Sequence, residues 1–168
     1  MSSSRGKGKA RLTKEEFAAR AEERRGPLYR VACAYLCREQ DRLDAVQEAL
    51  LHAWEARHKL RQEAYFKTWL TRIMIRECVN ILRQQKRVFP AESLPEPASA
   101  EPSGNPALRD AILALPRDLR IVIVLFYMEG YSTEEISRIL RTPKGTVCSR
   151  LSRARKMLKD TLREEADL

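Results

Sequence analysis

The sequence has no apolar run approaching the roughly 20 residues that a membrane-spanning helix needs. Its N-terminus, MSSSRGKGKARL, is basic but has no apolar segment, so it does not resemble an export signal. There are only 4 cysteines and no Cys-x-x-Cys pair, a pattern typical of free thiols in a reducing compartment. These absences predict a cytoplasmic protein that does not insert directly into a membrane.

The sequence also lacks the usual signatures of an enzyme. It has no glycine-rich loop that could cradle a phosphate, and its acidic residues are scattered over expected helix faces instead of clustering. We therefore expect no catalytic residue, no metal and no cofactor, and an action by binding. Cys33 and Cys37, with His52 and His58 elsewhere, leave open a zinc or redox switch. Small buried cysteines on an apolar helix face are the commoner arrangement.

Positive charge is in excess, and its distribution divides the chain. The net charge is +9, which favours a polyanionic partner, most simply nucleic acid. Residues 1–87 hold 20 Lys and Arg against 11 Asp and Glu, and residues 108–168 hold 12 against 9. Residues 88–107 hold three Glu, no basic residue and five of the 8 prolines. This segment is predicted to be a flexible linker between two domains.

No convincing strand pattern is present, and the predicted fold class is all-α, with two small helical domains joined by the linker. Residues 121–128 are ambiguous because their composition is β-rich, but Gly130 suits a helix stop equally well. Thr13-x-x-Glu16 and Ser132-x-x-Glu135 match the capping box that begins many helices. The expected helices are 14–25, 27–38, 41–58, 64–87, 107–114, 117–129, 133–140 and 144–160.

Residues 132–160 have the pattern of a helix-turn-helix. Thr142 is expected to cap the second helix, with Pro143 at its first position. The inner face of that helix is predicted to consist of Val147, Leu151, Ala154 and Leu158. The opposite side carries Ser149, Ser152, Arg153 and Lys156, flanked by Thr146, Arg150 and Arg155. Such side chains can contact base edges and phosphates in a major groove. A solvated basic helix within a bundle is the alternative.

A second basic helix is expected at 64–87. One side of it carries a continuous polar stripe of Arg72, Arg76, Asn80, Arg83 and Arg87, and another side a core face of Phe66, Leu70, Ile73, Met74 and Ile81. Tyr65, Phe66 and Trp69 lie beside the stripe, and aromatic side chains next to cations suit single-stranded nucleic acid, whose bases stack on them. The alternative for Phe66 and Trp69 is a place in the core.

The helix around 44–56 has a different character. Leu43, Val46, Leu50 and Trp54 form its expected core stripe, whereas Asp44, Glu48 and Glu55 line the opposite side together with Leu51. An acidic face with an exposed leucine is a poor DNA surface but suits docking to a basic protein. An ordinary solvated helix face is the alternative.

Four segments in this order, DAVQEALLHAWE, FKTWLTRI…NILRQQKR, LPRDLRIVIVLFYMEGYSTEEISRIL and KGTVCSRLSRARKML, resemble the extracytoplasmic-function (ECF) sigma factors of bacterial RNA polymerase. The resemblance covers about residues 27–160 apart from the linker. It implies a sigma factor that directs core polymerase to specific promoters and assists melting of the −10 element. The implied divisions are 1–25 (basic tail and possible first helix), 26–87 (domain 2, polymerase and −10 element), 88–107 (linker) and 108–162 (domain 4, −35 element).

The resemblance also implies roles for individual residues. The polymerase clamp would be bound by Asp44, Gln47, Glu48 and Leu51. The −10 DNA would be bound by Arg61, Tyr65, Phe66, Arg72, Arg76, Asn80, Arg83 and Arg87. The −35 DNA would be bound by Lys144, Thr146, Ser149, Arg150, Arg153, Arg155 and Lys156. Cys148 stands where the family usually has Lys or Arg, and Arg76 where it often has Asn, so we expect the promoter preference to differ.

The implied partners are promoter DNA, the clamp and flap regions of core RNA polymerase, and an anti-sigma factor. The implied location is the cytoplasm, at the nucleoid or held at the membrane through an anti-sigma factor. The main alternative is a stand-alone helix-turn-helix transcriptional regulator, which would bind its operator unaided and usually as a symmetric dimer. An enzyme acting on nucleic acid and a scaffold protein are the remaining alternatives.

Overall fold

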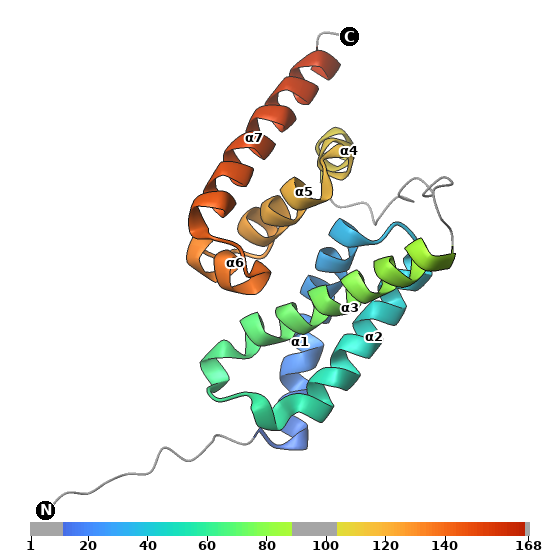
Figure 1. Ribbon diagram of the computed structural model, residues 1–168, viewed down its shortest axis with the longest axis vertical. Coiled ribbons are helices and arrows are strands. Elements are labelled where there is room, and N and C mark those ends of the chain that lie inside the picture. Colours follow the sequence, from blue (N-terminus) through green and yellow to red (C-terminus); the bar gives the residue numbers. More distant parts are fainter. Residues whose placement is uncertain (1–11, 89–103, 167–168) are drawn as a thin grey trace, which may run out of the picture.

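The computed structural model describes residues 12–88 and 104–166, and within these ranges it contains helices and no strand (Figure 1). The first group of helices comprises α1 (Lys14–Tyr35), α2 (Glu39–Ala56), the 3₁₀ turns η1 (Arg57–Lys59) and η2 (Glu63–Tyr65), and α3 (Phe66–Val88). The second group comprises α4 (Pro106–Ala114), α5 (Arg117–Ile123), the π-helical turn η3 (Val124–Met128), α6 (Thr133–Leu140) and α7 (Lys144–Ala166). The predicted all-α fold with two small helical domains is confirmed, while most of the expected linker lies outside the described residues.

Helix α1 is continuous where the sequence predicts two helices, 14–25 and 27–38, separated at Gly26. Proline removes one backbone hydrogen bond, to the carbonyl of Glu23, but Glu23 is exposed to water. Immediately beyond the proline, Leu28 and Val31 are almost completely buried. Burying two such side chains stabilises the helix by about 1.5–3 kcal/mol each, which exceeds the net value of one hydrogen bond. Tertiary packing therefore keeps the helix continuous across the proline.

The N-terminal half of α1 belongs to the core of the first group. The Phe17 ring meets the Trp54 ring edge-on at 5.2 Å between centroids and the Phe66 ring at 5.8 Å. Thr13 and Glu16 form the predicted capping box, with Glu16 N donating to Thr13 Oγ1 and Thr13 N donating to Glu16 Oε2. Residues 12–25, assigned from sequence to a tail with a possible first helix, thus pack as an integral part of the bundle. Residues 1–11 lie outside the described residues.

The ambiguous segment 121–128 is helical throughout. Its apolar side chains from Ile121 to Leu125 are buried, which explains the continuous apolar run. The segment ends in a π-helical turn, and Gly130 adopts a left-handed conformation with φ of 70°. The predicted glycine stop is confirmed, and its backbone angle is one that glycine adopts without strain.

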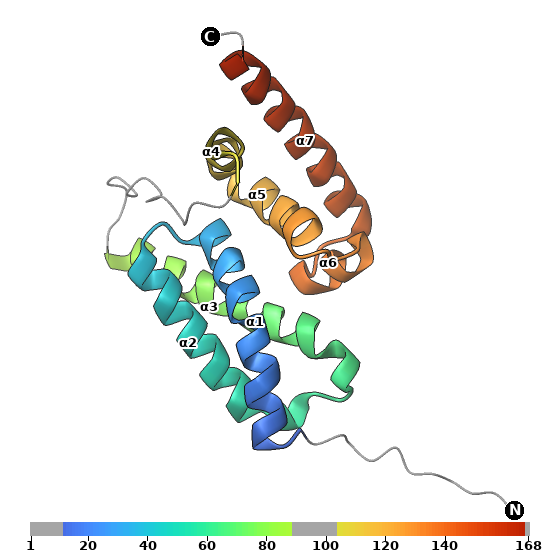
Figure 2. The same cartoon turned by 180° about the vertical axis from the view of Figure 1, so that it is seen from behind.

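The two groups of helices pack against each other. Helix α1 lies against α5 and η3, and α3 lies against α6; both views place α6 beside α3 (Figure 2). The buried apolar residues of the two groups form one continuous core. Consequently the helix-turn-helix of the second group is placed next to the start of α3. None of the described helices is long and apolar enough to cross a membrane.

We expect Pro27→Ala to raise the free energy of unfolding by about 1–3 kcal/mol, because alanine supplies the missing N–H and relieves the clash with the preceding turn. Gly26→Ala is a matched comparison, since a Cβ there would meet only Arg30 Nη1, at 3.7 Å, and its expected gain is about 0.5–1 kcal/mol. Urea denaturation followed by far-UV circular dichroism measures both. Loss of stability in Pro27→Ala would show that the bundle depends on the proline.

Candidate nucleic-acid and partner interfaces

Helix α2 presents the predicted acidic face to solvent. Asp44, Gln47, Glu48 and Leu51 are all exposed, and the Leu51 residue is 50% exposed. Gln40 Nε2 donates to Asp44 Oδ1 at 2.8 Å, which orients the carboxylate along the helix surface. The face therefore combines fixed negative charge with an apolar side chain, an arrangement suited to a basic protein surface that has an apolar pocket.

The inner face of α2 differs from the predicted stripe. Leu43 is 45% exposed, whereas the buried apolar positions are Val46 and three alanines, Ala45, Ala49 and Ala53. Small side chains allow α1 and α3 to approach α2 closely, so the helix buries alanines where the sequence pattern selects larger residues. Exposed Leu43 adds a second apolar side chain to the solvent side of α2.

Sequence reasoning missed the role of Arg42. It is 2% exposed and donates from Nε to the Leu36 carbonyl at 2.9 Å and from Nη2 to the Cys37 carbonyl at 3.1 Å. These carbonyls lie just beyond the end of α1, where helix carbonyl groups lack partners within the helix. The buried guanidinium thus fixes the angle at which α2 leaves α1. The two carbonyl acceptors come from the turn geometry, which the sequence pattern does not reveal.

His52 connects the acidic face to α3. Its Nδ1 lies 2.8 Å from Glu77 Oε1, and its Nε2 lies 3.9 Å from Glu48 Oε2. Glu77 is buried, so its carboxylate meets the His52 ring in an environment of reduced solvation. The hydrogen bond to Glu77 raises the pKa of His52, opposed by partial desolvation and assisted by the charges of Glu77, Glu48 and Glu55.

The loop before α3 carries the predicted aromatic residues, which have two different environments. Tyr65 is 51% exposed, whereas Phe66 is 5% exposed and packs against Phe17. Phe66 therefore takes the place in the core that the sequence offered as its alternative, and Tyr65 is the exposed ring. Arg20 of α1 donates to Glu63 Oε2 at 2.5 Å and so ties η2 to the bundle. The loop is held rigidly enough to present Tyr65 outward.

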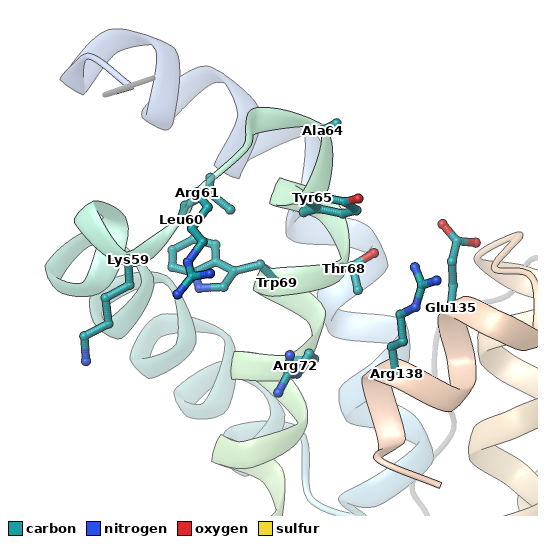
Figure 3. A pocket seen from close by; sticks show the side chains of 10 residues that line it. All are labelled: Lys59, Leu60, Arg61, Ala64, Tyr65, Thr68, Trp69, Arg72, Glu135 and Arg138. Carbon is teal, nitrogen blue, oxygen red and sulfur yellow. The ribbon is translucent and has the colours of Figure 1, made fainter. Parts of the chain in front are cut away.

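A cavity of about 310 Å³ lies beside this loop. It is lined by Lys59, Leu60, Arg61, Ala64, Tyr65, Thr68, Trp69, Arg72, Glu135 and Arg138. Figure 3 shows Trp69 and Arg61 on one side, with Glu135 and Arg138 extending from α6 on the other. An aromatic wall beside several guanidinium groups suits an unstacked base and its phosphate. The contribution of α6 could not be foreseen from the sequence, because it depends on how the two helical groups pack.

The polar stripe of α3 lies on the solvent side of the helix. Arg76, Arg83 and Arg87 are exposed, and Arg72 and Asn80 are partly exposed. The predicted core residues Leu70 and Met74 are fully buried. Sequence spacing therefore predicts the two main sides of this helix correctly.

Specific hydrogen bonds form the start of α6 and the turn between α6 and α7. Ser132 and Glu135 form the predicted capping box at the start of α6. Arg141 adopts the left-handed conformation with φ of 51°, and Ser137 Oγ donates to the Thr142 carbonyl at 2.6 Å. The predicted cap by Thr142 is wrong, because α7 begins at Lys144 and the Pro143 carbonyl accepts its first helical bond, from Val147 N at 3.1 Å. The Thr142 hydroxyl instead donates to the Leu140 carbonyl at 3.2 Å.

The two sides of α7 match the prediction. Val147, Leu151 and Ala154 are buried, and Leu158 is partly buried. The outer side exposes Cys148, Ser149, Ser152, Arg153 and Lys156. Helix α7 continues to Ala166, beyond the predicted end at 160. The exposed side forms a polar and cationic surface of the width that a major groove admits.

Three of the predicted DNA-binding cations already have partners within the second helical group. Lys144 Nζ pairs with Glu134 Oε1, an interaction that lowers the pKa of Glu134 and raises the pKa of Lys144. Arg150 Nε lies 3.7 Å from Asp118 Oδ2, so this arginine is directed towards α5. The Arg155 guanidinium carbon lies 5.8 Å from the centre of the Tyr127 ring. Arg153 and Lys156 remain on the outer surface with Ser149, whose hydroxyl donates to the Thr146 carbonyl.

The four cysteines are free thiols in the structure. In the part of the chain that the structure describes, no group of three or more potential metal ligands comes together. Burial raises the pKa of Cys33 and raises the pKa of Cys78 to about 12, which keeps both thiols protonated and poor as ligands. The zinc alternative therefore has no support among the described residues.

Two protein-family models match the chain. Residues 21–88 match Sigma-70 region 2, and residues 106–158 match Sigma-70, region 4. The first match lies within the α1–α3 group and the second within the α4–α7 group.

Curated relatives named as RNA polymerase sigma factors match the chain over most of their lengths. The chain is 29% identical over 161 residues to RNA polymerase sigma factor SigV of Bacillus subtilis, covering 94% of this chain and 97% of the relative. It is 33% identical over 135 residues to ECF RNA polymerase sigma factor SigM of Mycobacterium tuberculosis, covering 78% and 69%. It is 35% identical over 134 residues to the ECF RNA polymerase sigma-E factor of Escherichia coli K12, covering 68% and 70%.

Solved structures show the same fold. The sigma factor RpoE from Bartonella quintana, solved in complex with the anti-sigma factor NepR, superposes with a TM-score of 0.75 at 25% identity, covering 89% of this chain and 98% of the other. CnrH, solved with the cytosolic domain of CnrY, gives a TM-score of 0.68 at 22% identity, covering 90% of each chain. The second likeness concerns the fold alone.

Replacing His52 should reveal a pH-dependent bond between α2 and α3. Because the pKa of His52 is raised in the folded protein, its stabilising effect is complete below the ordinary value of about 6.5 and is lost as pH rises through the folded value. We expect His52→Gln to destabilise the protein more at about pH 5.5 than at about pH 8.5. Thermal unfolding at both pH values measures this, with His58→Gln as the control on the same segment. An equal loss at both pH values would contradict the ionic contribution.

Proposed function

The chain belongs to the ECF sigma factors of bacterial RNA polymerase, and from this membership we propose how its exposed surfaces divide promoter recognition between them. As a sigma factor it directs core RNA polymerase to promoter DNA, and its action is binding and not catalysis. The observation that carries the proposed division is the separation of exposed charge: an acidic face on α2, and cationic faces on α3 and on α7.

The outer side of α7 is the proposed reader of the −35 duplex. Arg153 and Ser149 are exposed in the middle of that side and can reach base edges, while Lys156 is placed for a phosphate. Lys144, Thr146, Arg150 and Arg155 border the same surface. Phosphate oxygens can replace the partners that Lys144, Arg150 and Arg155 now have, Glu134, Asp118 and Tyr127. Cys148, exposed on the same side, alters the contact that Lys or Arg would make there.

The cavity beside η2 is the proposed site for the −10 element. Tyr65 and Trp69 offer ring faces for an unstacked base, and Arg61 and Arg72 line the same cavity. The stripe from Arg76 through Asn80 to Arg83 and Arg87 continues along α3 and is proposed to follow the strand backbone. Phe66 supports this surface from the core.

The acidic face of α2 is the proposed contact with the polymerase clamp. Its carboxylates, Asp44 and Glu48, would pair with cations, while Leu51 and Leu43 would enter apolar pockets. Domain boundaries near 26–87 and 108–162 are proposed accordingly, with α1 extending the first domain towards the N-terminus. A contact of the second domain with the polymerase flap is proposed as well.

An anti-sigma factor is a proposed further partner, because the similar sigma factor RpoE was solved in complex with the anti-sigma factor NepR. A cytoplasmic location at the nucleoid, or at the membrane through such a partner, is proposed on the same ground. A stand-alone transcriptional regulator would need only residues 132–160. That function would not account for the region 2 match over 21–88 or for the acidic face of α2.

In vitro transcription with purified core polymerase and genomic fragments tests the proposal directly. We expect the wild-type protein to direct initiation from discrete sites, and Glu48→Lys to reduce both initiation and polymerase affinity at least about tenfold, as loss of a central charge pair does. Glu23→Lys, which reverses an exposed charge on α1, is the matched control. Specific binding of duplex operators without any polymerase-dependent initiation would support the stand-alone regulator instead.

Arg153→Ala tests base reading by α7. We expect −35 affinity to fall by about 1–3 kcal/mol and discrimination between −35 sequences to relax, because a guanidinium can bond two acceptors of guanine. Lys156→Ala is the comparison, with a uniform loss across sequences and a smaller salt dependence. Competition binding of holoenzyme to promoter variants measures both. Equal losses by Arg153→Ala on promoter and random DNA would contradict base reading.

A further inference from the structure

A buried carboxylate joins the two helical groups. Glu129 follows η3, and its side chain is only 2% exposed. Arg30 of α1 binds it with two hydrogen bonds, from Nε to Oε1 at 2.6 Å and from Nη2 to Oε2 at 3.3 Å. Arg24, on the same helix, places Nη2 4.0 Å from Oε2. A carboxylate so far from water requires such partners, so Glu129 fixes the position of the second group on α1.

A third cation meets Glu129 from α3. Lys67 Nζ donates to the Glu129 carbonyl at 2.9 Å and lies 4.2 Å from the centre of the Tyr131 ring. The Tyr131 hydroxyl lies 2.8 Å from Thr71 Oγ1 and donates to the Lys67 carbonyl at 3.3 Å. Thr71 and Tyr131 are both buried. Glu129 and Tyr131 thus occupy one continuous surface formed by α1 and α3.

The local backbone explains why these two residues reach that surface. In the π-helical turn, Glu129 N bonds the Val124 carbonyl at 3.0 Å, and Tyr131 N bonds the Leu125 carbonyl at 3.0 Å. Gly130 between them has φ of 70°, so the chain reverses within one residue. Single π-helical turns inside helices are frequent at functional sites. Here the turn directs Glu129 and Tyr131 away from the second group and onto the first.

The packing of the second helical group on the first is called the closed arrangement. In it, α6 restricts access to the proposed −10 site. Glu135 and Arg138 of α6 form one wall of the cavity that Tyr65 and Trp69 line (Figure 3). Lys67, which contacts Glu129, immediately precedes Thr68, which lines the cavity. The cavity and the cation that meets Glu129 from α3 therefore both lie at the N-terminal end of α3.

The closed arrangement has an energetic cost, so another anion can displace Glu129 from its cations. Arg24 Nε and Arg120 Nε are buried without a hydrogen-bond partner. Arg120 reaches across to the Ala34 carbonyl at 3.2 Å, and burial lowers its pKa. Unpaired buried donors oppose closure, so a stronger anion can compete with Glu129. Two guanidinium groups suit phosphate oxygens at least as well as one carboxylate, and the Lys67 ammonium group, which now binds the Glu129 main-chain carbonyl, can also bind a phosphate.

We propose that Arg24, Arg30 and Lys67 form a phosphate-binding site for single-stranded promoter DNA, and that Glu129 occupies this site in the free protein as an internal competitor. The proposal rests on the proposed role of the neighbouring cavity in binding the −10 element. Release of Glu129 withdraws α6 from the cavity and frees the three cations to bind the strand. Domain closure and strand binding are then mutually exclusive.

The test uses the full chain without polymerase and a fluorescein-labelled single-stranded DNA of about 12 nucleotides. We expect Glu129→Gln to increase the radius of gyration measured by small-angle X-ray scattering. We expect it to tighten DNA binding about tenfold, the gain for a free protein that is about nine-tenths closed. Glu164→Gln is the matched control, because it removes the same charge from an exposed position on α7. An affinity gain no larger than that of Glu164→Gln overturns the competition.

A second pair of variants tests the cation site itself. In the Glu129→Gln background, Arg30→Gln should weaken DNA binding about fivefold or more, because one charge-assisted phosphate contact is lost. Arg25→Gln in the same background is the control, since Arg25 is an exposed arginine of the same helix that pairs with Glu22. Equal effects of Arg30→Gln and Arg25→Gln overturn the phosphate site. If Glu129→Gln does not fold, Tyr131→Phe, which loses the bonds to Thr71 and Lys67, should shift both measurements in the same direction.

Failure of this inference differs from failure of the proposed function. If wild-type protein directs polymerase initiation while Glu129→Gln matches Glu164→Gln in size and DNA affinity, the internal competition is wrong and the sigma-factor surfaces stand. If Glu129→Gln opens and binds DNA tightly while initiation is absent, the competition stands and the assignment of the surfaces to promoter recognition is wrong.

Discussion

Burial of charge is the constraint on which the arrangement of the helices depends. A charged side chain removed from water needs partners that replace its hydration, and those partners must lie at fixed distances. The buried charged residues of the described structure each lie where two elements meet. Arg42 binds the carbonyls at the end of α1, Glu77 meets His52 between α2 and α3, and Glu129 meets Arg30 between the two helical groups. Apolar burial supplies most of the stability, and these polar contacts select one geometry among many similar packings.

The division of charge between neighbouring helices allows one small bundle to serve two partners. Helices α2 and α3 pack against each other, and Gln85 Nε2 donates to Asp41 Oδ2 at 2.7 Å across their junction. The outer side of α2 is acidic, whereas the outer side of α3 carries arginines. A basic protein surface and a nucleic acid can therefore bind the same bundle on separate faces, and each face repels the other's ligand.

Periodicity in the sequence correctly predicts a helix face when the only distinction is between a side that meets solvent and a side that is buried. The buried face of α7, the exposed arginines of α3 and both capping boxes match, because they depend on contacts within one helix or with neighbouring residues. The predictions that fail involve Pro27, Leu43 and Thr142. The first two depend on packing between helices, whereas the third depends on the geometry of a single turn. The α6 wall of the cavity and the three cations around Glu129 were missed because they also depend on packing between helices.

The closed arrangement also orders the steps of promoter binding. In it the outer side of α7 remains exposed, with Arg153 and Lys156 on the surface, while α6 forms a wall of the cavity proposed for the −10 strand. Duplex DNA can therefore approach α7 before the two helical groups separate, but an unpaired strand gains its full contacts only afterwards. Because Glu129 and the strand phosphates require the same cations, melted DNA stabilises the open form by the difference in its affinity for the two forms. Capture of the unpaired strand and separation of the groups are thus one coupled equilibrium, in which each favours the other.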